Sequence, residues 1–170
     1  MRVERSFGFI DLCGFTAFTD QHGDEQAVEV LGEFRRSVRR LASDFGVRIA
    51  KWIGDGAMFV AVDPEPLIML VLELEQLFAV DSTPLVLRGG MSSGAVILFE
   101  GDDHIGRAVN LASRLCDKAA PGECLATLEI AKRAPDLVVA EPVGAVDVPG
   151  FARAVEVARL AFAPQALPTA

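Results

Sequence analysis

Cysteine is scarce in this sequence of 170 residues, which contains Cys13, Cys116 and Cys124 and no others. An odd number of cysteines without the short spacings of a metal site predicts neither a disulfide framework nor a zinc site. Reduced thiols with a structural role are the remaining interpretation. They indicate a cytoplasmic protein.

Long hydrophobic runs are also missing, although 51% of the residues are hydrophobic. The longest run, Leu67–Leu72, is far shorter than the roughly 20 residues that cross a bilayer. Glu4 and Asp11 interrupt the segment Met1–Gly14, which therefore lacks the apolar core of a signal peptide. We expect no membrane contact from residues 1–170. Because the first predicted strand starts almost at the first residue, we expect a domain that was separated from regulatory segments or naturally lacks them.

Positive charge is in deficit, since 16 Lys and Arg stand against 24 Asp and Glu and give a formal net charge of −8. This charge argues against nucleic acids and anionic membranes as main partners. A site for a small phosphorylated molecule depends on local charge only, and Lys51, Arg88, Arg107 and Arg114 are candidates for that charge. The length and composition are typical of one globular domain with a sizeable core.

The first motif is a strand that ends in a carboxylate and a glycine turn, Phe7-Gly-Phe-Ile-Asp-Leu-Cys-Gly-Phe-Thr16. The apolar run Phe7–Ile10 predicts a buried strand, and the residues after Asp11 turn the chain into a helix. Backbone N–H groups at such a turn can bind a phosphate, and the carboxylate can bind a divalent cation. The alternative is an aspartate that only caps the helix.

A second carboxylate, Asp55, lies at the tip of a predicted hairpin in Lys51-Trp-Ile-Gly-Asp-Gly-Ala-Met-Phe-Val60. If the strand before Asp11 pairs beside this hairpin, the two carboxylates converge. Two carboxylates and a backbone carbonyl, completed by substrate phosphates, are typical ligands of Mg²⁺.

The order of predicted elements is strand, helix, hairpin, helix, strand pair and helix, and Leu85–Phe99 supplies the strand pair. This order indicates an α+β fold with a ferredoxin-like core, in which helices cover an antiparallel sheet.

A third motif, Asp103-His-Ile-Gly-Arg-Ala-Val-Asn-Leu-Ala-Ser-Arg114, resembles the Asp-x-x-Gly-x-x-Val-Asn-x-Ala-x-Arg segment of class III nucleotide cyclases. Phe9-x-Asp-Leu-x-Gly-Phe-Thr16 and Lys51-x-x-Gly-Asp55 resemble two other signatures of that family, in the same order. The resemblance runs from about Ser6 to Leu160. It implies the cyclase fold, with a catalytic domain over residues 1–160. Residues 161–170 contain two prolines and no periodicity, and we expect them to form a loose C-terminal tail.

The resemblance also implies roles for single residues. Two divalent cations, Mg²⁺ or Mn²⁺, would be bound by Asp11, Asp55 and the carbonyl of Leu12, and the catalytic residues would be Asp11, Asp55, Asn110 and Arg114. Asn110 would orient the ribose and Arg114 would stabilise the α-phosphate, although a surface ion pair is the alternative for Arg114. The other substrate-binding residues would be Arg88, which contacts the terminal phosphates unless it is a surface arginine, and the turn residues Leu12, Cys13, Gly14, Phe15 and Thr16.

The base is expected to be adenine, because Lys51 offers a donor and Asp103 an acceptor, the complement of adenine N1 and N6. In this family a Lys and Asp pair implies ATP, whereas guanylate cyclases carry Glu and Cys there. An ordinary solvated loop acid is the alternative for Asp103.

One position departs from the family pattern. A Lys-Gly pair commonly holds the triphosphate near the end of the domain, and Pro149-Gly150 stands in its place here. Proline has no N–H to donate. We expect either that Arg153 substitutes for the lysine or that triphosphate binding is weaker.

The sequence therefore predicts an adenylate cyclase that converts ATP into 3′,5′-cyclic AMP and pyrophosphate as a head-to-tail homodimer. One subunit would supply Asp11, Asp55 and Arg88 to each shared site, and the other would supply Lys51, Asp103, Asn110 and Arg114. Two alternatives stay open: a non-catalytic cyclase-homology module that binds a nucleotide or a partner domain, and a guanylate cyclase.

Overall fold

The computed structural model describes residues 1–79, 84–101 and 103–164. The helices are α1 (Phe15–His22), α2 (Asp24–Asp44), α3 (Pro64–Ala79), α4 (Arg107–Lys118) and α5 (Leu128–Ala131). The strands are β1 (Arg2–Leu12), β2 (Arg48–Ile53), β3 (Gly56–Ala61), β4 (Leu87–Phe99), β5 (Asp103–Ile105), β6 (Cys124–Thr127), β7 (Val138–Val146) and β8 (Val155–Phe162). No helix within these ranges combines the length and the apolarity that a membrane span requires.

The strands form one 8-stranded sheet in the order β2-β3-β1-β4-β6-β8-β7, with β5 paired to β4. The first four strands of this order are antiparallel and form the ferredoxin-like core, which confirms the predicted α+β fold. One pair departs from the antiparallel expectation, since β4 and β6 are parallel. The reason is their connection, because α4 carries the chain back across the sheet before β6 begins.

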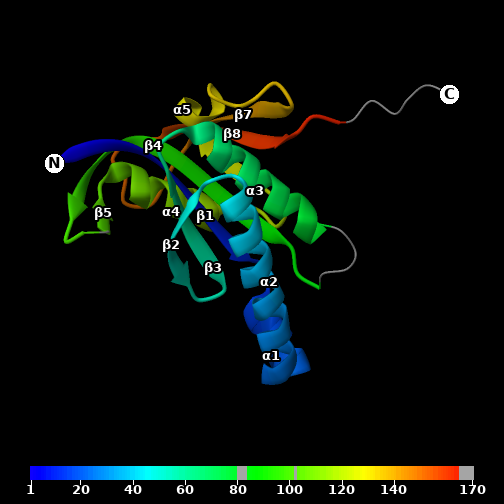
Figure 1. Cartoon of the computed structure of the whole chain (residues 1–170). Coiled ribbons are helices and arrows are strands. Elements are labelled where there is room, and N and C mark those ends of the chain that lie inside the picture. Colours follow the sequence, from blue (N-terminus) through cyan, green and yellow to red (C-terminus); the bar gives the residue numbers. More distant parts are fainter. Residues whose placement is uncertain (80–83, 102, 165–170) are drawn as a thin grey trace.

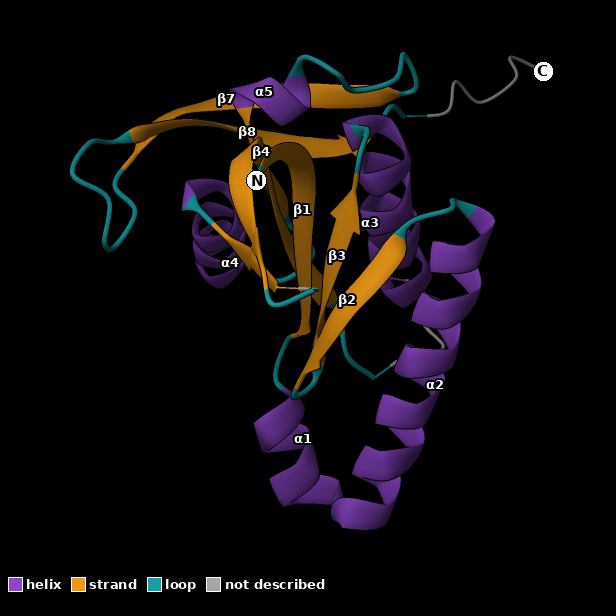
Figure 2. Cartoon of the chain, turned by 60° about the vertical axis from the view of Figure 1, so that its left-hand side comes forward, coloured by secondary structure: helices purple, strands orange, loops and turns teal. Residues whose placement is uncertain are grey.

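The two faces of the sheet pack against different helices (Figure 2). Alternation along β1 sends Ile10 and Leu12 into the larger core, which contains buried residues of α2 and α3. Phe7 faces the other way and packs with Ala108 and Ala112 of α4. Asp11 has the same parity as Phe7, so the alternation assigns it to the α4 side of the sheet.

Gly90 allows α4 to lie close against β4. A Cβ atom at this position would stand 2.1 Å from the backbone nitrogen of Cys116 and 2.3 Å from the carbonyl oxygen of Ala112. Any other residue would therefore push the helix away from the sheet.

Two boundaries differ from the sequence-based expectation. The segment expected to form two strands is one long strand, β4, because β1 pairs with it continuously from Arg2 to Leu12. Strand β8 extends to Phe162, two residues into the expected tail, where it still pairs with Val138. Residues 165–170 of that tail lie outside the described ranges.

Candidate active site

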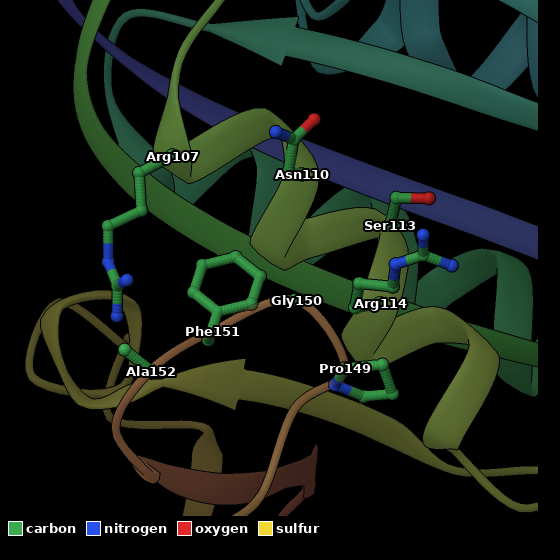
Figure 3. A pocket seen from close by; sticks show the side chains of 8 residues that line it. All are labelled: Arg107, Asn110, Ser113, Arg114, Pro149, Gly150, Phe151 and Ala152. Atoms are coloured by element: carbon green, nitrogen blue, oxygen red, sulfur yellow. The ribbon is translucent and has the colours of Figure 1, made fainter.

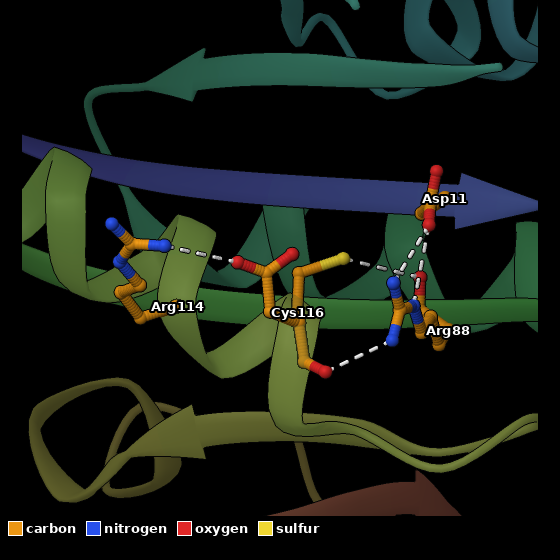
Figure 4. A network of polar contacts seen from close by, with 5 residues as sticks. Asp11, Arg88, Arg114 and Cys116 are labelled. Atoms are coloured by element: carbon orange, nitrogen blue, oxygen red, sulfur yellow. Dashed lines mark hydrogen bonds and ion pairs between the residues drawn. The ribbon is translucent and has the colours of Figure 1, made fainter. Parts of the chain in front are cut away.

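Asp11 and Arg88 face each other on neighbouring strands at the end of β1. The register of the β1–β4 pair places them directly opposite, and Nη2 of Arg88 lies 3.0 Å from Oδ2 of Asp11. The Nε group of Arg88 donates to the same oxygen at 3.3 Å, and Nη1 donates to the backbone carbonyl of Asp117 at 2.9 Å. Figure 4 shows this network running from β1 through β4 to α4. Its contacts hold the Asp11 carboxylate in one orientation.

The hairpin between β2 and β3 brings Asp55 to the same point. Gly54 opens its tip with φ 57, a left-handed conformation that favours glycine. A Cβ atom at Gly56 would lie 2.5 Å from the carbonyl oxygen of Ile10 and 3.3 Å from Oδ1 of Asp11, so only glycine permits this approach. The amide of Leu12 donates to the carbonyl of Asp55 at 3.3 Å. Two acids 44 positions apart in the sequence thus converge at one strand end, as the sequence predicts.

The closeness of Asp11 and Asp55 affects the pKa of Asp55. Burial raises the pKa of Asp55, and the neighbouring carboxylate of Asp11 raises it further. Within the described residues no group of three or more His, Cys, Asp or Glu is arranged to hold a metal ion. Paired carboxylates with a backbone carbonyl nearby nevertheless fit Mg²⁺ or Mn²⁺, since these ions take their remaining oxygen ligands from water or substrate phosphates.

Removing the charge of Asp55 is expected to stabilise the metal-free domain. The raised pKa means that the ionised carboxylate is less stable in the folded state than in the unfolded chain. Asp55→Asn should therefore raise the melting temperature at pH 7. Below the ordinary carboxyl pKa of about 3.9 both states are protonated, and the gain should vanish. Thermal melts of wild type and Asp55→Asn without metal, from pH 3 to pH 8, would measure this gain in melting temperature. An equal gain at every pH would show that the charge of Asp55 is not its cause.

The turn after β1 offers fewer free amides than the sequence suggests. The N–H group of Cys13 donates to the carbonyl of Val86 at 2.8 Å, so in this conformation it is not available to a phosphate. The reason is that main-chain pairing between the β1 and β4 segments continues one residue past Leu12. Gly14 precedes α1 with φ 78. Phe15 and Thr16 open this helix, and amides in a first helical turn have no intrahelical acceptor.

Helix α4 presents Asn110 and Arg114 to one open cavity of about 580 Å³ (Figure 3). The two residues are one turn apart, so they share a face, as predicted. The opposite wall of this cavity is the loop that contains Pro149 and Gly150. The structure thus brings Asn110, Arg114 and the position of the family's triphosphate lysine together. The described residues that line the cavity include no acid; they are Arg107, Asn110, Ser113, Arg114, Pro149, Gly150, Phe151 and Ala152.

Arg114 also forms an exposed ion pair with Asp117, with 3.5 Å between Nη1 and Oδ2. An exposed pair of this kind contributes at most about 1 kcal/mol, so it leaves the guanidinium available to a ligand. Asp117 is at the same time the residue whose backbone carbonyl accepts from Arg88. The Asp11–Arg88 pair and Arg114 therefore both lie on the α4 side of the sheet, and Asp117 contacts both arginines.

Lys51 and Asp103 are in direct contact, with Nζ of the lysine against Oδ1 of the aspartate. They lie on β2 and β5, which do not pair with each other. Both side chains are about half exposed, so a ligand can reach them. The donor and the acceptor proposed to contact the base therefore stand side by side in one subunit.

Sequence reasoning missed Ser113 and Phe151, which line the cavity beside the predicted residues. Ser113 lies three residues after Asn110, and helical periodicity could have identified it. Phe151 follows the Pro149-Gly150 pair, and no local signal marks it. Arg153, expected as a substitute for the lysine, is exposed and does not line the cavity.

Comparison with known sequences finds relatives for most of this chain, although no family model matches it. It is 36% identical over 134 residues to an "uncharacterized protein" of Mycobacterium tuberculosis H37Rv, an alignment that covers 79% of this chain and 35% of that protein. It is 38% identical over 120 residues to the pH-sensitive adenylate cyclase of Mycobacterium tuberculosis CDC 1551, covering 69% and 29%. The chain spans about a third of the length of these relatives.

Solved structures share the fold over almost the whole chain. The adenylyl cyclase CyaB from P. aeruginosa superposes with a TM-score of 0.87 at 24% identity, covering 98% of both chains. The guanylate cyclase domain of RhGC from Catenaria anguillulae, in complex with GTP, superposes with a TM-score of 0.84 at 18% identity and covers 95% of this chain and 98% of that one. The fold therefore matches adenylyl and guanylyl cyclases almost equally, and the choice of base has to come from side chains.

Proposed function

This chain belongs to the class III nucleotide cyclases, and on that premise we propose that its domain converts ATP into 3′,5′-cyclic AMP and pyrophosphate. The observation that carries the proposal is the convergence of Asp11 and Asp55 at the end of β1. Paired carboxylates with one raised pKa suit a site that binds divalent cations and phosphates. The rest of the site supplies the groups that the reaction needs.

The carboxylates of Asp11 and Asp55 and the carbonyl of Leu12 would bind two divalent cations, Mg²⁺ or Mn²⁺. Bound there, the ions would neutralise phosphate charge and favour the deprotonated ribose 3′-oxygen. Arg88 acts on Asp11 through its ion pair and, once substrate arrives, on the terminal phosphates. A cation at Asp11 would share this carboxylate with Arg88 or displace it.

The α4 cavity would hold the ribose and the α-phosphate. Asn110 donates to and accepts from the ribose, which fixes the 3′-oxygen in line with the α-phosphorus. Arg114 places a permanent positive charge where negative charge develops on the α-phosphate as pyrophosphate leaves. Lys51 and Asp103 donate to and accept from the adenine edge.

We propose further that two copies of the chain share each site. None of the described residues that line the α4 cavity is acidic, and in this proposal the metal-binding acids of a second copy complete the site. Exposed apolar side chains at the β4–β5 end supply a surface for a second copy. Ile97, Phe99 and Ile105 are 42%, 48% and 54% exposed there, and Ile97 pairs with Ile105. A closed two-fold dimer would contain two such sites.

The experiment that tests the function is an assay of the purified chain with ATP or GTP and with Mg²⁺ or Mn²⁺. We expect cyclic AMP and pyrophosphate in equal amounts, and no product after chelation of the metal. Nucleotide binding without product would instead support the non-catalytic module, which the proline at position 149 favours. A preference for GTP would support the guanylate cyclase.

Exchange of the two base-contacting residues is expected to change the substrate. Lys51→Glu with Asp103→Cys replaces the donor with an acceptor and the acceptor with a thiol, the pattern of guanylate cyclases. Each mispaired hydrogen bond costs about 1–3 kcal/mol, so ATP turnover should fall by at least about tenfold while GTP turnover appears. The measurement is the ratio of kcat/KM for ATP and for GTP.

A matched control uses another exposed ion pair of this chain. Arg133 and Glu65 lie 3.4 Å apart and are each 54% exposed, close to the exposure of Lys51 and Asp103. The control variant Arg133→Glu with Glu65→Arg should leave the ratio of kcat/KM for ATP and for GTP unchanged. If the Lys51 and Asp103 variant also keeps the wild-type ratio, these residues do not contact the base.

A further inference from the structure

We propose that Arg35 of α2 positions Asp55 by holding the peptide bond that joins Gly54 to Asp55. The inference rests on the proposed function, because it concerns the metal-binding half of that site. Nη2 of Arg35 donates to the carbonyl oxygen of Gly54 at 3.3 Å, across 19 positions of sequence. This contact is possible because α2 lies alongside β2 and the hairpin that β2 opens (Figure 2).

The guanidinium of Arg35 is supported by the ring of Trp52. Its Cζ atom lies 5.0 Å from the ring centre, and Cζ of Arg39 lies 5.1 Å from the same ring. Both distances are within the range of a cation–π interaction. Phe34 of α2 meets Trp52 in a T-shaped contact, with 6.4 Å between the ring centres, and Phe34 is fully buried. Arg35 therefore reaches the hairpin tip from a side chain that is anchored to the core.

The peptide that Arg35 holds also contacts the carboxylate of Asp55. A peptide unit is planar, so the carbonyl of Gly54 and the amide of Asp55 rotate together. Burial and the charge of Asp11 raise the pKa of Asp55, and a hydrogen bond from the amide of Asp55 to its own carboxylate opposes them. Arg35 thus fixes one end of a peptide whose other end orients the carboxylate.

Little else restricts the rotation of this peptide. Gly54 is exposed and has φ 57, and a Cβ atom there would meet no atom within 4 Å beyond its chain neighbours. Glycine also lacks the side chain that limits rotation at other residues. The amide of Leu12 donates to the carbonyl of Asp55 at 3.3 Å, which holds the chain after Asp55 and not the peptide before it.

A positioning role and a charge effect predict opposite results. Arg35 and Arg39 both place a positive charge beside the hairpin, so removing either charge alone would reduce the repulsion of a divalent cation. Removing the hydrogen bond from Arg35 would instead free the Gly54–Asp55 peptide and weaken the binding of the cation. Arg39 shares the contact with Trp52, and within the described ranges it forms no hydrogen bond with the hairpin tip.

The test measures the dissociation constant of Mn²⁺ by electron paramagnetic resonance, and the Mn²⁺ concentration that gives half-maximal cyclic AMP formation. Arg35→Ala should raise both by about threefold to tenfold, the effect of losing one hydrogen bond. The rate at saturating Mn²⁺ should come close to that of the wild type, because a higher concentration compensates for weaker binding. Partial unfolding would instead lower the maximal rate and leave the half-maximal concentration unchanged.

Two further variants separate the hydrogen bond from the aromatic contact. Arg39→Ala is the matched control, because it removes a positive charge and a contact with Trp52 and keeps the bond to Gly54. Its dissociation constant for Mn²⁺ should stay unchanged or fall. Arg35→Lys keeps a charged donor without the planar fork, so it should recover part of the affinity that Arg35→Ala loses.

Three results would overturn the inference. They are unchanged or tighter Mn²⁺ binding by Arg35→Ala, an equal loss of affinity in Arg35→Ala and Arg39→Ala, and a lower maximal rate at an unchanged half-maximal concentration. A wild type that binds Mn²⁺ but forms no cyclic AMP would refute the proposed function, and the resonance measurements would still decide the role of Arg35. A wild type that binds no Mn²⁺ would overturn both proposals.

Discussion

Replacing Asp55 by asparagine is expected to lower the rate of cyclic AMP formation by at least about a thousandfold, because it removes one of the two carboxylates that bind the metal ions. Asn keeps the shape of the side chain and its place at the hairpin tip. The same change removes repulsion from Asp11, so the inactive variant should be at least as stable as the wild type. Loss of activity with retained stability would separate a metal-binding role from a folding role.

Asp11→Asn should abolish activity to the same extent but should not stabilise the fold. Asp11 is the ion-pair partner of Arg88, and its loss leaves a half-buried guanidinium without that carboxylate. Asp63→Asn, an exposed acid just beyond the other end of β3, is the control and should keep full activity. The measurement is the rate at saturating ATP over a range of Mn²⁺ concentrations. Near-wild-type activity in either Asp11→Asn or Asp55→Asn would contradict the assignment of two metal ions to this pair of acids.

The parts of this site that sequence could predict are those fixed by local structure. A strand end at Asp11 and a Gly-Asp-Gly turn at Asp55 are short-range features, and pairing of β1 with β3 then suffices to join them. The common face of Asn110 and Arg114 follows from helical spacing in the same way. In each case the decisive geometry lies within one element or one strand pair.

The parts that sequence could not predict depend on where elements end and meet. The contact of Lys51 with Asp103 requires β5, a strand of three residues that no periodicity marks. Val28 has the spacing of a core residue but is 68% exposed, because α1 and the first turns of α2 extend beyond the edge of the sheet (Figures 1 and 2). The hydrogen bond from the Cys13 amide to the carbonyl of Val86 likewise depends on how far main-chain pairing continues past β1.

The shared site leads to the last prediction, which is complementation between two inactive variants. Asp55→Ala and Arg114→Ala should each be inactive alone, since every site would lack one essential group. In a mixed dimer one site would carry both changes and the other would carry neither. Random exchange makes about half of the dimers mixed, so roughly a quarter of wild-type activity should return. The two proteins must be co-expressed, or mixed and given time to exchange subunits.

The structure makes this test necessary, because both sets of residues lie on the same side of one subunit. Asp117 touches Arg88 through its carbonyl and Arg114 through its carboxylate, so a site within one subunit is the direct alternative. The shared-site model also makes a demand on the β2–β3 hairpin. Lys51 and Asp55 both lie on this hairpin, and the model assigns them to different sites. That assignment requires the hairpin to lie near the two-fold axis.

Two controls make the result decisive. Asp11→Asn mixed with Asp55→Asn should stay inactive, because both changes affect the same half of the site and every mixed site still lacks one acid. Ile105→Asp, placed in the exposed apolar group at the β4–β5 end, should lower dimer formation and complementation together. If a fully exchanged mixture of Asp55→Ala and Arg114→Ala stays as inactive as its components, the metal-binding acids and Arg114 act within one subunit.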